Sequence, residues 1–250
     1  MNNTWQHLQT DVLILGSGGA GLCAVLHLMD HKPQPEVFLA VRGLFGKSGC
    51  TRMVQGGYNA VIDKSDSLEA HFLDTINGGQ WLNNQDLAWK MVCEAPERVL
   101  ELENRAGCFF DRNPDGTVHQ KPFAGQSFDR TVHKGDLTGI EIINRLSEQV
   151  AAMDNVIIGE EMRGVDLLFD RTGQKVSGAL LIDLRRGEFI VVEARAVLLA
   201  TGGGPTMYKI TAPCHDKTCD GIAMGFRAGT TIIDMEMVQF HPTGLLAGNS

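Results

Sequence analysis

The sequence has no excess of basic residues. Its 22 lysines and arginines are outnumbered by 30 aspartates and glutamates, which gives a formal net charge of −8. Proteins that bind nucleic acids normally present a basic face to the phosphate backbone. The charge balance therefore argues against a nucleic-acid partner, although local positive groups can still bind a small anion.

Long apolar segments and a cysteine framework are also lacking. No run approaches the roughly 20 apolar residues of a membrane span. The polar start MNNTWQHLQT lacks the basic-then-apolar pattern of a signal peptide. The six cysteines are scattered without a CxxC pair, which suits reduced thiols better than disulfides. We therefore expect a soluble, cytoplasmic protein with no membrane span of its own.

Two groups of reactive side chains lack the further residues that a metal site or a hydrolase site needs. The segment from Cys214 to Cys219 contains His215 but no second pair of metal ligands, so we interpret it as a thiol-bearing loop. Ser127 and His133 share one loop, yet nothing there resembles the turn that exposes a hydrolase nucleophile. We expect neither a metal site nor a hydrolase triad.

Glycine, in contrast, is abundant, with 29 residues and no collagen-like period. Three of these glycines, Gly16, Gly18 and Gly21, form GxGxxG after the apolar run DVLIL. A helical pattern follows at 22–29 and a second strand, EVFLAV, at 36–41. In such a βαβ unit the glycines allow backbone to approach a pyrophosphate, which the helix N-terminus then binds. The start of the chain therefore predicts a dinucleotide site.

The remaining pattern changes from helical to extended along the chain. Helices are expected at 67–76, at 86–105 with Pro96 starting a second helix, and at 140–150 with Thr138 as a cap. The runs NVIIG, VDLLF, VSGALLI, EFIVV and AVLLA then predict a β-meander that returns to a buried strand. No repeat or linker divides the chain, so we expect an α/β fold without a clear domain boundary.

Two segments bear on which dinucleotide binds. The second strand ends at Arg42 rather than at an acidic residue, which suits either a 2′-phosphate, as in NADP, or a contact to adenine or phosphate. The run AVLLATGGG at 196–204 is typical of flavoproteins with two dinucleotide folds, and a nicotinamide dehydrogenase does not need it. A simple strand and glycine turn is the alternative for this run.

These segments together resemble the flavoprotein subunit of the succinate dehydrogenase/fumarate reductase family. The resemblance covers nearly the whole chain in order, through DVLILGSGGAG, MVQGGYNA, HFLDTINGGQWLNNQD, KPFAGQS, LLATGG, CDGIAMGFRAG and MEMVQFHPTGL. It implies an α/β, Rossmann-like two-dinucleotide-fold FAD domain with a β-meander insertion. The family lacks the acidic ribose residue, which removes the argument for NADP. The activity implied is the FAD-dependent interconversion of fumarate and succinate by hydride transfer at flavin N5.

The resemblance also implies roles for individual residues. His241, in QFHPTG, donates to a substrate carboxylate, and Phe123 lies against the reacting carbon–carbon bond. The implied FAD contacts are Gly16, Ser17, Gly18, Gly19, Ala20, Gly21, Arg42, Lys47, Ser48, Gly49, Cys50, Thr51, Gln55, Gly56, Gly57, Thr201, Gly202, Gly203 and Asp220. The expected partners are a small dicarboxylate and an iron-sulfur electron-transfer subunit, through which the protein lies at the periphery of the inner membrane.

Cys50 departs from the family pattern. Respiratory members have a histidine at this position that is covalently bonded to a methyl group of the flavin. Because neighbouring residues of this signature differ as well, we expect FAD to be bound without a covalent link. A thioether to Cys50 is the alternative. Without a tether, the chemistry is biased toward fumarate reduction or toward a substrate other than succinate.

The chain resembles only the N-terminal half of the family. We expect residues 1–237 to form an FAD-binding domain that lacks its C-terminal segment, and residues 238–250 to begin a capping domain. The proton-donating arginine of the family has no counterpart within the 250 residues. Two alternatives remain beside a dicarboxylate enzyme: an L-aspartate or amino-acid oxidase, and a non-catalytic flavin-binding half of a split enzyme.

Overall fold

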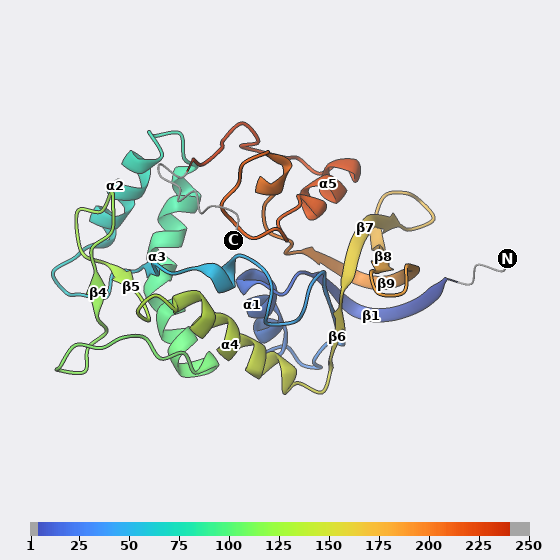
Figure 1. The fold of residues 1–250 in the computed structure, drawn as a ribbon, viewed down its shortest axis with the longest axis horizontal. Coiled ribbons are helices and arrows are strands. Elements are labelled where there is room, and N and C mark those ends of the chain that lie inside the picture. Colours follow the sequence, from blue (N-terminus) through green and yellow to red (C-terminus); the bar gives the residue numbers. More distant parts are fainter. Residues whose placement is uncertain (1–4, 241–250) are drawn as a thin grey trace, which may run out of the picture. The chain divides into compact units, whose positions relative to one another are not determined.

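A computed structural model describes residues 5–240 of the chain (Figure 1). The chain divides into two compact units. The first unit comprises Met1–Cys50 and Val150–Ser250, and the second unit comprises Thr51–Gln149. This division falls inside the predicted FAD-binding domain, and the predicted boundary at 237/238 stays a prediction. Each unit is described by itself.

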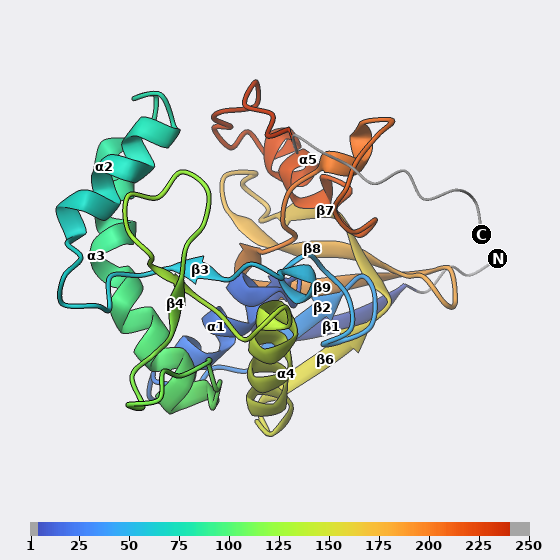
Figure 2. The same cartoon turned by 60° about the vertical axis from the view of Figure 1, so that its left-hand side comes forward.

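A six-stranded mixed sheet forms the centre of the first unit, and Figure 2 shows its strands side by side. The spatial order is β6-β2-β1-β9-β8-β7. β1 pairs in parallel with β2 and β9, and β6 pairs in parallel with β2, while β7 and β8 are antiparallel additions. The strands are β1 (Gln6–Leu15), β2 (Val37–Val41), β6 (Val156–Glu160), β7 (Met162–Phe169), β8 (Val176–Asp183) and β9 (Glu188–Leu199).

The strands form where the sequence places apolar, β-branched residues without interruption. All five residues of β2 are buried, as expected for a central parallel strand covered on both faces. Leu13 and Leu15 of β1 pack with Leu181 of β8 and Val192 of β9 in one hydrophobic core. Met224 belongs to the same core and lies in α5 (Asp220–Arg227), which therefore packs on this part of the sheet. Burying these side chains is the main driving force for the first unit.

The glycine-rich turn leads directly into α1 (Gly19–Leu28). This helix buries Leu22, Val25 and Leu26, which follow the spacing of one helical face. The predicted strand–turn–helix–strand unit is thus confirmed, although β1 extends five residues before Asp11.

The predicted β-meander was wrong in two details. NVIIG contains β6, which pairs in parallel with β2 and does not join the meander. EFIVV and the AVLL of AVLLA are one continuous strand, β9, because nothing between them turns the chain: Glu193 and Arg195 are exposed while Val192 and Ala194 are buried. The remaining hairpins, β7-β8 and β8-β9, are antiparallel as expected.

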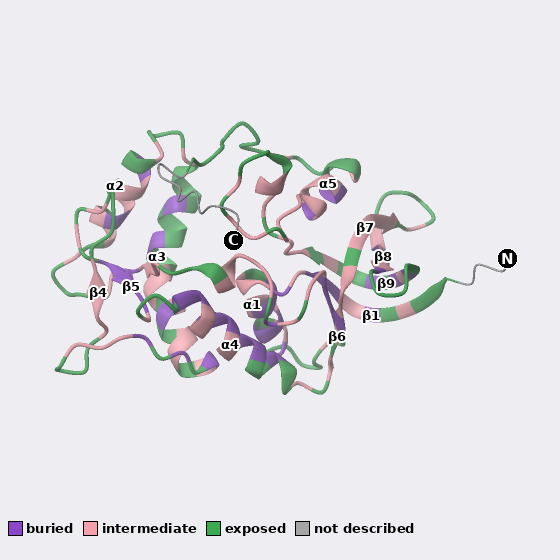
Figure 3. Ribbon diagram, in the orientation of Figure 1, coloured by how far each residue is buried: buried purple, intermediate pink, exposed green. Residues whose placement is uncertain are grey.

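The second unit is mainly helical. Its helices are α2 (Leu68–Gly78), α3 (Gln85–Glu101) and α4 (Thr138–Ala151), the last of which ends just inside the first unit. Its short antiparallel sheet comprises β3 (Tyr58–Asn59), β5 (Thr131–Val132) and β4 (Gln120–Lys121), in that order. β5 is buried, as Figure 3 shows. Side chains cap α2 and α3, where Ser67 Oγ accepts from Ala70 N at 3.0 Å and Asn84 Oδ1 accepts from Leu87 N at 3.1 Å.

The prediction that Pro96 begins a second helix was wrong. Pro96 lies inside α3, which continues to Glu101 and then widens into a π-helical turn at Leu102–Ala106. The apolar positions Val92 and Val99 are both completely buried on either side of the proline. Their burial favours a continuous helix despite the backbone hydrogen bond that proline cannot donate. Thr138 is the first residue of α4 rather than a preceding cap, and its Oγ1 accepts from Lys134 N.

Candidate functional site

The predicted FAD residues of the first unit gather at one edge of its sheet. Leu15 lies opposite Ala40 in the β1-β2 ladder and opposite Leu199 in the β1-β9 ladder. Because these strands are parallel, their carboxyl ends lie together, followed by Gly16, by Arg42 and by the 201–203 turn. Strands β2 and β9 lie on opposite sides of β1, so the chain reverses its winding direction here. Open α/β sheets bind ligands at such a switch point.

The glycines of the first turn are required by close packing. Gly16 has a φ of +112°, and a Cβ there would lie 2.4 Å from the carbonyl oxygen of Ala200. A Cβ on Gly21 would lie 1.9 Å from the carbonyl oxygen of Gly16. No larger side chain fits either position without moving backbone. The two ends of the predicted cofactor turn, Gly16 and Gly21, thus touch each other and the end of β9.

The N-terminus of α1 is suited to an anion. Gly18 is the N-cap residue, no side chain caps the helix, and its first turn holds no acidic residue. The dipole of a helix and its terminal N–H groups favour a negative charge at this end. The residues present therefore fit the pyrophosphate of a dinucleotide.

Arg42 ties the end of β2 to a distant segment, 214–220. Its guanidinium donates to Thr218 Oγ1 and, at 3.4 Å, to the carbonyl oxygen of Asp216. Gly49 N donates to the Asp216 carboxylate at 3.2 Å, with Gly49 in the left-handed region at a φ of +90°. The loop holding Lys47, Ser48 and Gly49 is thus attached to a segment 167 positions later. Asp216 and Thr218 were missed by the sequence analysis, because no local pattern reveals a partner at that separation.

Asp220 is held at the start of α5 by two arginines. Its carboxylate accepts from Arg163 Nε at 3.1 Å and from another guanidinium nitrogen of Arg163 at 2.7 Å. Arg42 lies 3.8 Å away. Only 11% of the Asp220 side chain is exposed. Arg163, on β7, is a further residue that the sequence analysis missed.

Cys50 lies beside a second thiol. Its Sγ is 3.1 Å from the Sγ of Cys214, and both side chains are half-buried. Burial raises the pKa of the Cys214 thiol, and its contact with Cys50 acts in the same direction. The thiol-bearing loop expected at 214–219 is therefore paired with the predicted cofactor loop.

The third predicted turn follows β9. Thr201 Oγ1 accepts from Gly221 N at 3.1 Å, and this bond attaches the turn to the start of α5. Gly202 has a φ of +73°. Thr201, Gly202 and Gly203 thus lie at the carboxyl edge of the sheet together with the glycine turn.

The remaining predicted residues belong to the second unit. Thr51 begins a 3-10 helix at Thr51–Met53, and Gln55 is exposed. The ring of Phe123 lies beside Gly56, where an added Cβ would be 3.1 Å from the ring. A cavity of about 580 Å³ opens next to them, lined by Gly57, Tyr58, His71, Met91, Arg98 and Phe123. The second unit therefore brings the predicted QGG segment and Phe123 together.

A buried ionic network supports the loop that carries Phe123. Arg130 has no exposed surface and donates twice to Asp66, at 2.8 and 2.9 Å. It also donates to Asp74, whose carboxylate accepts from Ser127 N and Oγ at 2.8 Å each. Ser127 is thus occupied by Asp74 and not by a catalytic histidine. The stretch from 123 to 130 is fixed at its C-terminal end by this network.

Some predictions lie outside what the structure describes. His241 follows the last described residue, Phe240, so its predicted contact with substrate stays a prediction. Among residues 5–240, no three His, Cys, Asp or Glu side chains are grouped as metal ligands. Within the same range, no helix is both long enough and apolar enough to cross a bilayer.

Comparison with known proteins identifies the family. Residues 11–249 match the family described as FAD binding domain. The chain belongs to this family. FAD is therefore its cofactor, and the glycine turn, the α1 N-terminus and the 201–203 turn fit that group. The Rossmann-like fold predicted from the resemblance is also confirmed.

Relatives of this FAD-binding chain are flavoproteins. It is 45% identical to an uncharacterized FAD-dependent oxidoreductase of Methanocaldococcus jannaschii, over 96% of this chain and 43% of the relative. It is 37% identical to the fumarate reductase flavoprotein subunit of Mycobacterium tuberculosis, over 95% of this chain and 40% of that protein. The chain thus spans less than half the length of these relatives.

Solved structures agree with this assignment. Sdh1 of Mycobacterium smegmatis is similar with a TM-score of 0.89 and 37% identity, over 96% of this chain and 41% of that one. A quinol fumarate reductase of Escherichia coli has a TM-score of 0.88 and 33% identity, over 96% of this chain and 40% of that one. The resemblance to flavoprotein subunits of the succinate dehydrogenase/fumarate reductase family is confirmed.

Proposed function

We propose that the protein carrying this chain interconverts fumarate and succinate, or acts on a close C4-dicarboxylate. The observation that carries the proposal is the pairing of Phe123 with the QGG segment beside a cavity in the second unit. Relatives named fumarate reductase support the substrate class. A bound FAD supplies a hydride donor or acceptor at its N5 atom.

The chain's own residues would bind and shield the substrate. Phe123 offers a flat apolar face, and 57% of it is exposed and so free to contact a ligand. Apolar walls exclude water from the site, which protects a hydride transfer. His241 would donate a hydrogen bond to a substrate carboxylate and so fix its orientation.

A direct assay tests the substrate class. The full protein that carries this chain should reduce fumarate with a reduced dye as electron donor, and it should oxidise L-aspartate slowly or not at all. Aspartate oxidation without fumarate reduction would instead support the amino-acid oxidase. An absence of turnover with all three substrates, succinate included, would favour a flavin-binding half of a split enzyme.

The role of His241 is tested by substitution. His241→Ala should weaken dicarboxylate binding by about 1.5–3 kcal/mol, the value of a hydrogen bond to a charged group. The flavin should remain bound. His215→Ala is the matched control, since His215 is exposed and is not assigned to the substrate. Loss of FAD with unchanged kinetics would contradict the substrate role.

We also propose that FAD is held without a covalent bond. Support comes from Cys50, whose sulfur contacts that of Cys214. Acid precipitation of the full protein should release yellow flavin into the supernatant, and Cys50→Ser should still purify yellow. Flavin that stays in the wild-type pellet but leaves the Cys50→Ser pellet would establish a thioether.

The electron-transfer partner we propose is an iron-sulfur subunit, and the proposed location is the cytoplasm, at the inner membrane through that partner. The motivation is that several relatives are named flavoprotein subunits. The protein purified from its natural source should bring with it a second chain containing iron and acid-labile sulfide. A purified active enzyme without either would contradict this assembly.

A further inference from the structure

Two thiols of the first unit face each other from segments far apart in the sequence. The sulfurs of Cys50 and Cys214 are 3.1 Å apart, although 164 positions separate the residues. A disulfide has a sulfur–sulfur distance of about 2.05 Å, so closing this pair requires a movement of roughly 1 Å. We propose that Cys50 and Cys214 form a reversible dithiol–disulfide pair that exchanges with low-molecular-weight disulfides.

The backbone around the two sulfurs is already fixed. Gly49 N, next to Cys50, donates to the carboxylate of Asp216, two residues after Cys214. The carbonyl oxygen of Asp216 also accepts from Arg42. Within segment 214–217, Lys217 N donates to the carbonyl oxygen of Cys214 at 3.4 Å. The sulfurs therefore meet without a loop having to fold first, which favours an intramolecular disulfide over reaction with a separate molecule.

The surroundings of this sulfur pair do not fit a metal site or a pairing with another cysteine. A metal ion needs further ligands, and the part of the chain that the structure describes holds no group of three. Cys219, five positions from Cys214, lies beside Gly204, where an added Cβ would be 2.6 Å from its sulfur. The sulfur–sulfur contact is thus specific to Cys50 and Cys214.

The exchange is balanced with a small disulfide such as oxidised glutathione as the oxidant. The thiolate of Cys50 attacks one sulfur of that disulfide, and one glutathione leaves as a thiolate. Cys214 then loses its proton and attacks the Cys50 sulfur, which expels the second glutathione. Overall two protein thiols and one small disulfide become one protein disulfide and two small thiols. A dithiol reductant reverses both steps.

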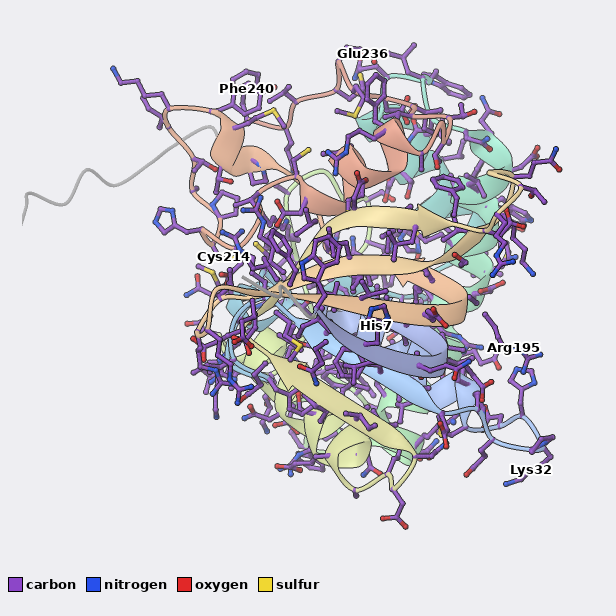
Figure 4. All side chains as sticks on the ribbon, turned by 90° about the vertical axis from the view of Figure 1, so that its right-hand side faces the viewer. His7, Lys32, Arg195, Cys214, Glu236 and Phe240 are labelled. Atoms are coloured by element: carbon purple, nitrogen blue, oxygen red, sulfur yellow. The ribbon has the colours of Figure 1, made fainter. Side chains whose placement is uncertain are left out.

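The surroundings of Cys214 bear on the order of attack. Burial raises the pKa of Cys214, so its thiol stays protonated longer as the pH increases. In the proposed exchange Cys50 makes the first attack, and Cys214 resolves the mixed disulfide. Both residues are half-buried, so part of each residue is open to solvent. Figure 4 shows Cys214 beyond one end of the sheet, opposite the end near Lys32.

The disulfide would clamp the loop that ends at Cys50. In the reduced protein this loop is attached to segment 214–220 by hydrogen bonds, and oxidation adds a covalent connection. Amide hydrogens of residues 43–50 should then exchange several-fold more slowly. That this loop also contacts FAD rests on the proposed function, whereas the disulfide itself does not.

Peptide mapping tests the pair directly, because trypsin separates the relevant cysteines. Cleavage after lysine and arginine places Cys50 in residues 48–52, Cys214 in residues 210–217 and Cys219 in residues 218–227. The native full protein is treated with oxidised glutathione, its remaining thiols are alkylated, and it is digested. We expect peptides 48–52 and 210–217 to be joined, with the mass of two hydrogen atoms lost, and dithiothreitol to separate them.

A single substitution tests the order of the two steps. In Cys214→Ser, peptide 48–52 should carry a stable glutathione adduct, because the resolving thiol is gone. Cys93→Ser is the matched control, since Cys93 is exposed in the second unit and should leave the linkage unchanged.

Three results would overturn the proposal. One is that Cys50 and Cys214 both remain open to alkylation in the oxidised wild-type protein. Another is that Cys50 is joined to the peptide of Cys219. The third is that wild-type Cys50 stops at the glutathione adduct although Cys214 is present. None of these outcomes depends on activity.

Discussion

Gly16 is a residue whose identity the packing dictates. Its φ of +112° and the 2.4 Å separation between an added Cβ and the Ala200 carbonyl oxygen leave no room for a side chain. A substitution is unfavourable for two reasons: the left-handed backbone strains a residue with a Cβ, and the end of β9 has to move. Because the 201–203 turn follows β9, such a movement disturbs two parts of the predicted FAD site together.

Gly16→Ala should therefore lose most of its bound FAD. Gly173→Ala is the matched control, because Gly173 also has a positive φ, of +71°, yet an added Cβ meets nothing within 4 Å. The control should lose about 1–2 kcal/mol of stability and keep its flavin. The ratio of flavin to protein absorbance in the purified variants measures this. Equal flavin content in both variants would contradict the packing argument.

Arg130 is a buried charge that must stay paired with a carboxylate. Asp66 has 1% of its side chain exposed, so removing the arginine leaves a carboxylate with neither water nor a cation. Breaking such a pair typically costs about 3–5 kcal/mol.

Arg130→Met should lower the free energy of unfolding by about that amount, measured by urea denaturation. Arg145→Met provides the comparison, because the Arg145 side chain is 43% exposed and pairs with Glu141 and with the exposed Glu148. Exposed pairs contribute about 0–1 kcal/mol. If both substitutions cost the same, the buried network does not stabilise the second unit.

At the scale of elements, α3 persists through a residue that normally ends a helix. Pro96 lacks the N–H that would bond one turn back, and the helix nevertheless continues to Glu101. A proline in a helix interior is about 3 kcal/mol less favourable than alanine. The helix continues because Val92 and Val99 are buried on one face before and after the proline.

Pro96→Ala should raise the free energy of unfolding by about 1–3 kcal/mol, since it restores the missing donor. Glu97→Ala, at the next and exposed position, should change stability by less than about 0.5 kcal/mol. A destabilised Pro96→Ala in chemical denaturation would show instead that the packing of the ring itself is needed.

For the molecule as a whole, buried groups that titrate determine how stability changes as the pH falls. Burial lowers the pKa of His71, and the positive charge of Arg130 acts in the same direction. Burial opposes ionisation of Asp74, yet hydrogen bonds from Ser127 and Arg130 hold its pKa below the ordinary value. In both cases the unfolded chain binds its proton at higher pH than the folded protein does. Stability is therefore present above the unfolded pKa and is lost as the pH falls.

The unfolding temperature should consequently fall in two steps on acidification. The first begins below about pH 6.5, where His71 binds a proton in the unfolded chain, and the second begins below about pH 4, from Asp74. A loss of about 1 kcal/mol lowers Tm by about 2–4 °C for a chain of this size. His71→Gln should reduce the first step, whereas His215→Gln, at an exposed position, should not. Identical pH profiles for the two variants would contradict the assignment.

Features that adjacent residues carry could be predicted from the sequence alone, whereas features that depend on distant residues could not. The strand–turn–helix start of the chain, the glycine motif and the flavin cofactor were all predicted, because adjacent residues carry their pattern. The errors arose where residues far apart in the sequence determine the structure. EFIVV and AVLL form one strand since β1 pairs with residues of both runs, from Ile190 to Leu199. The sequence shows no such partner.

The sequence by itself determined the chemistry at each turn: the glycines after β1, the thiol at position 50 and the aromatic ring at 123. Only the tertiary structure decided which of these features meet. Arg42 reaches Thr218 across 176 positions, and Cys50 reaches Cys214 across 164. The physical reason is that parallel strands bring their carboxyl ends to one edge irrespective of distance along the chain. Side chains that follow those strands therefore become neighbours through sheet topology, which no local pattern of residues encodes.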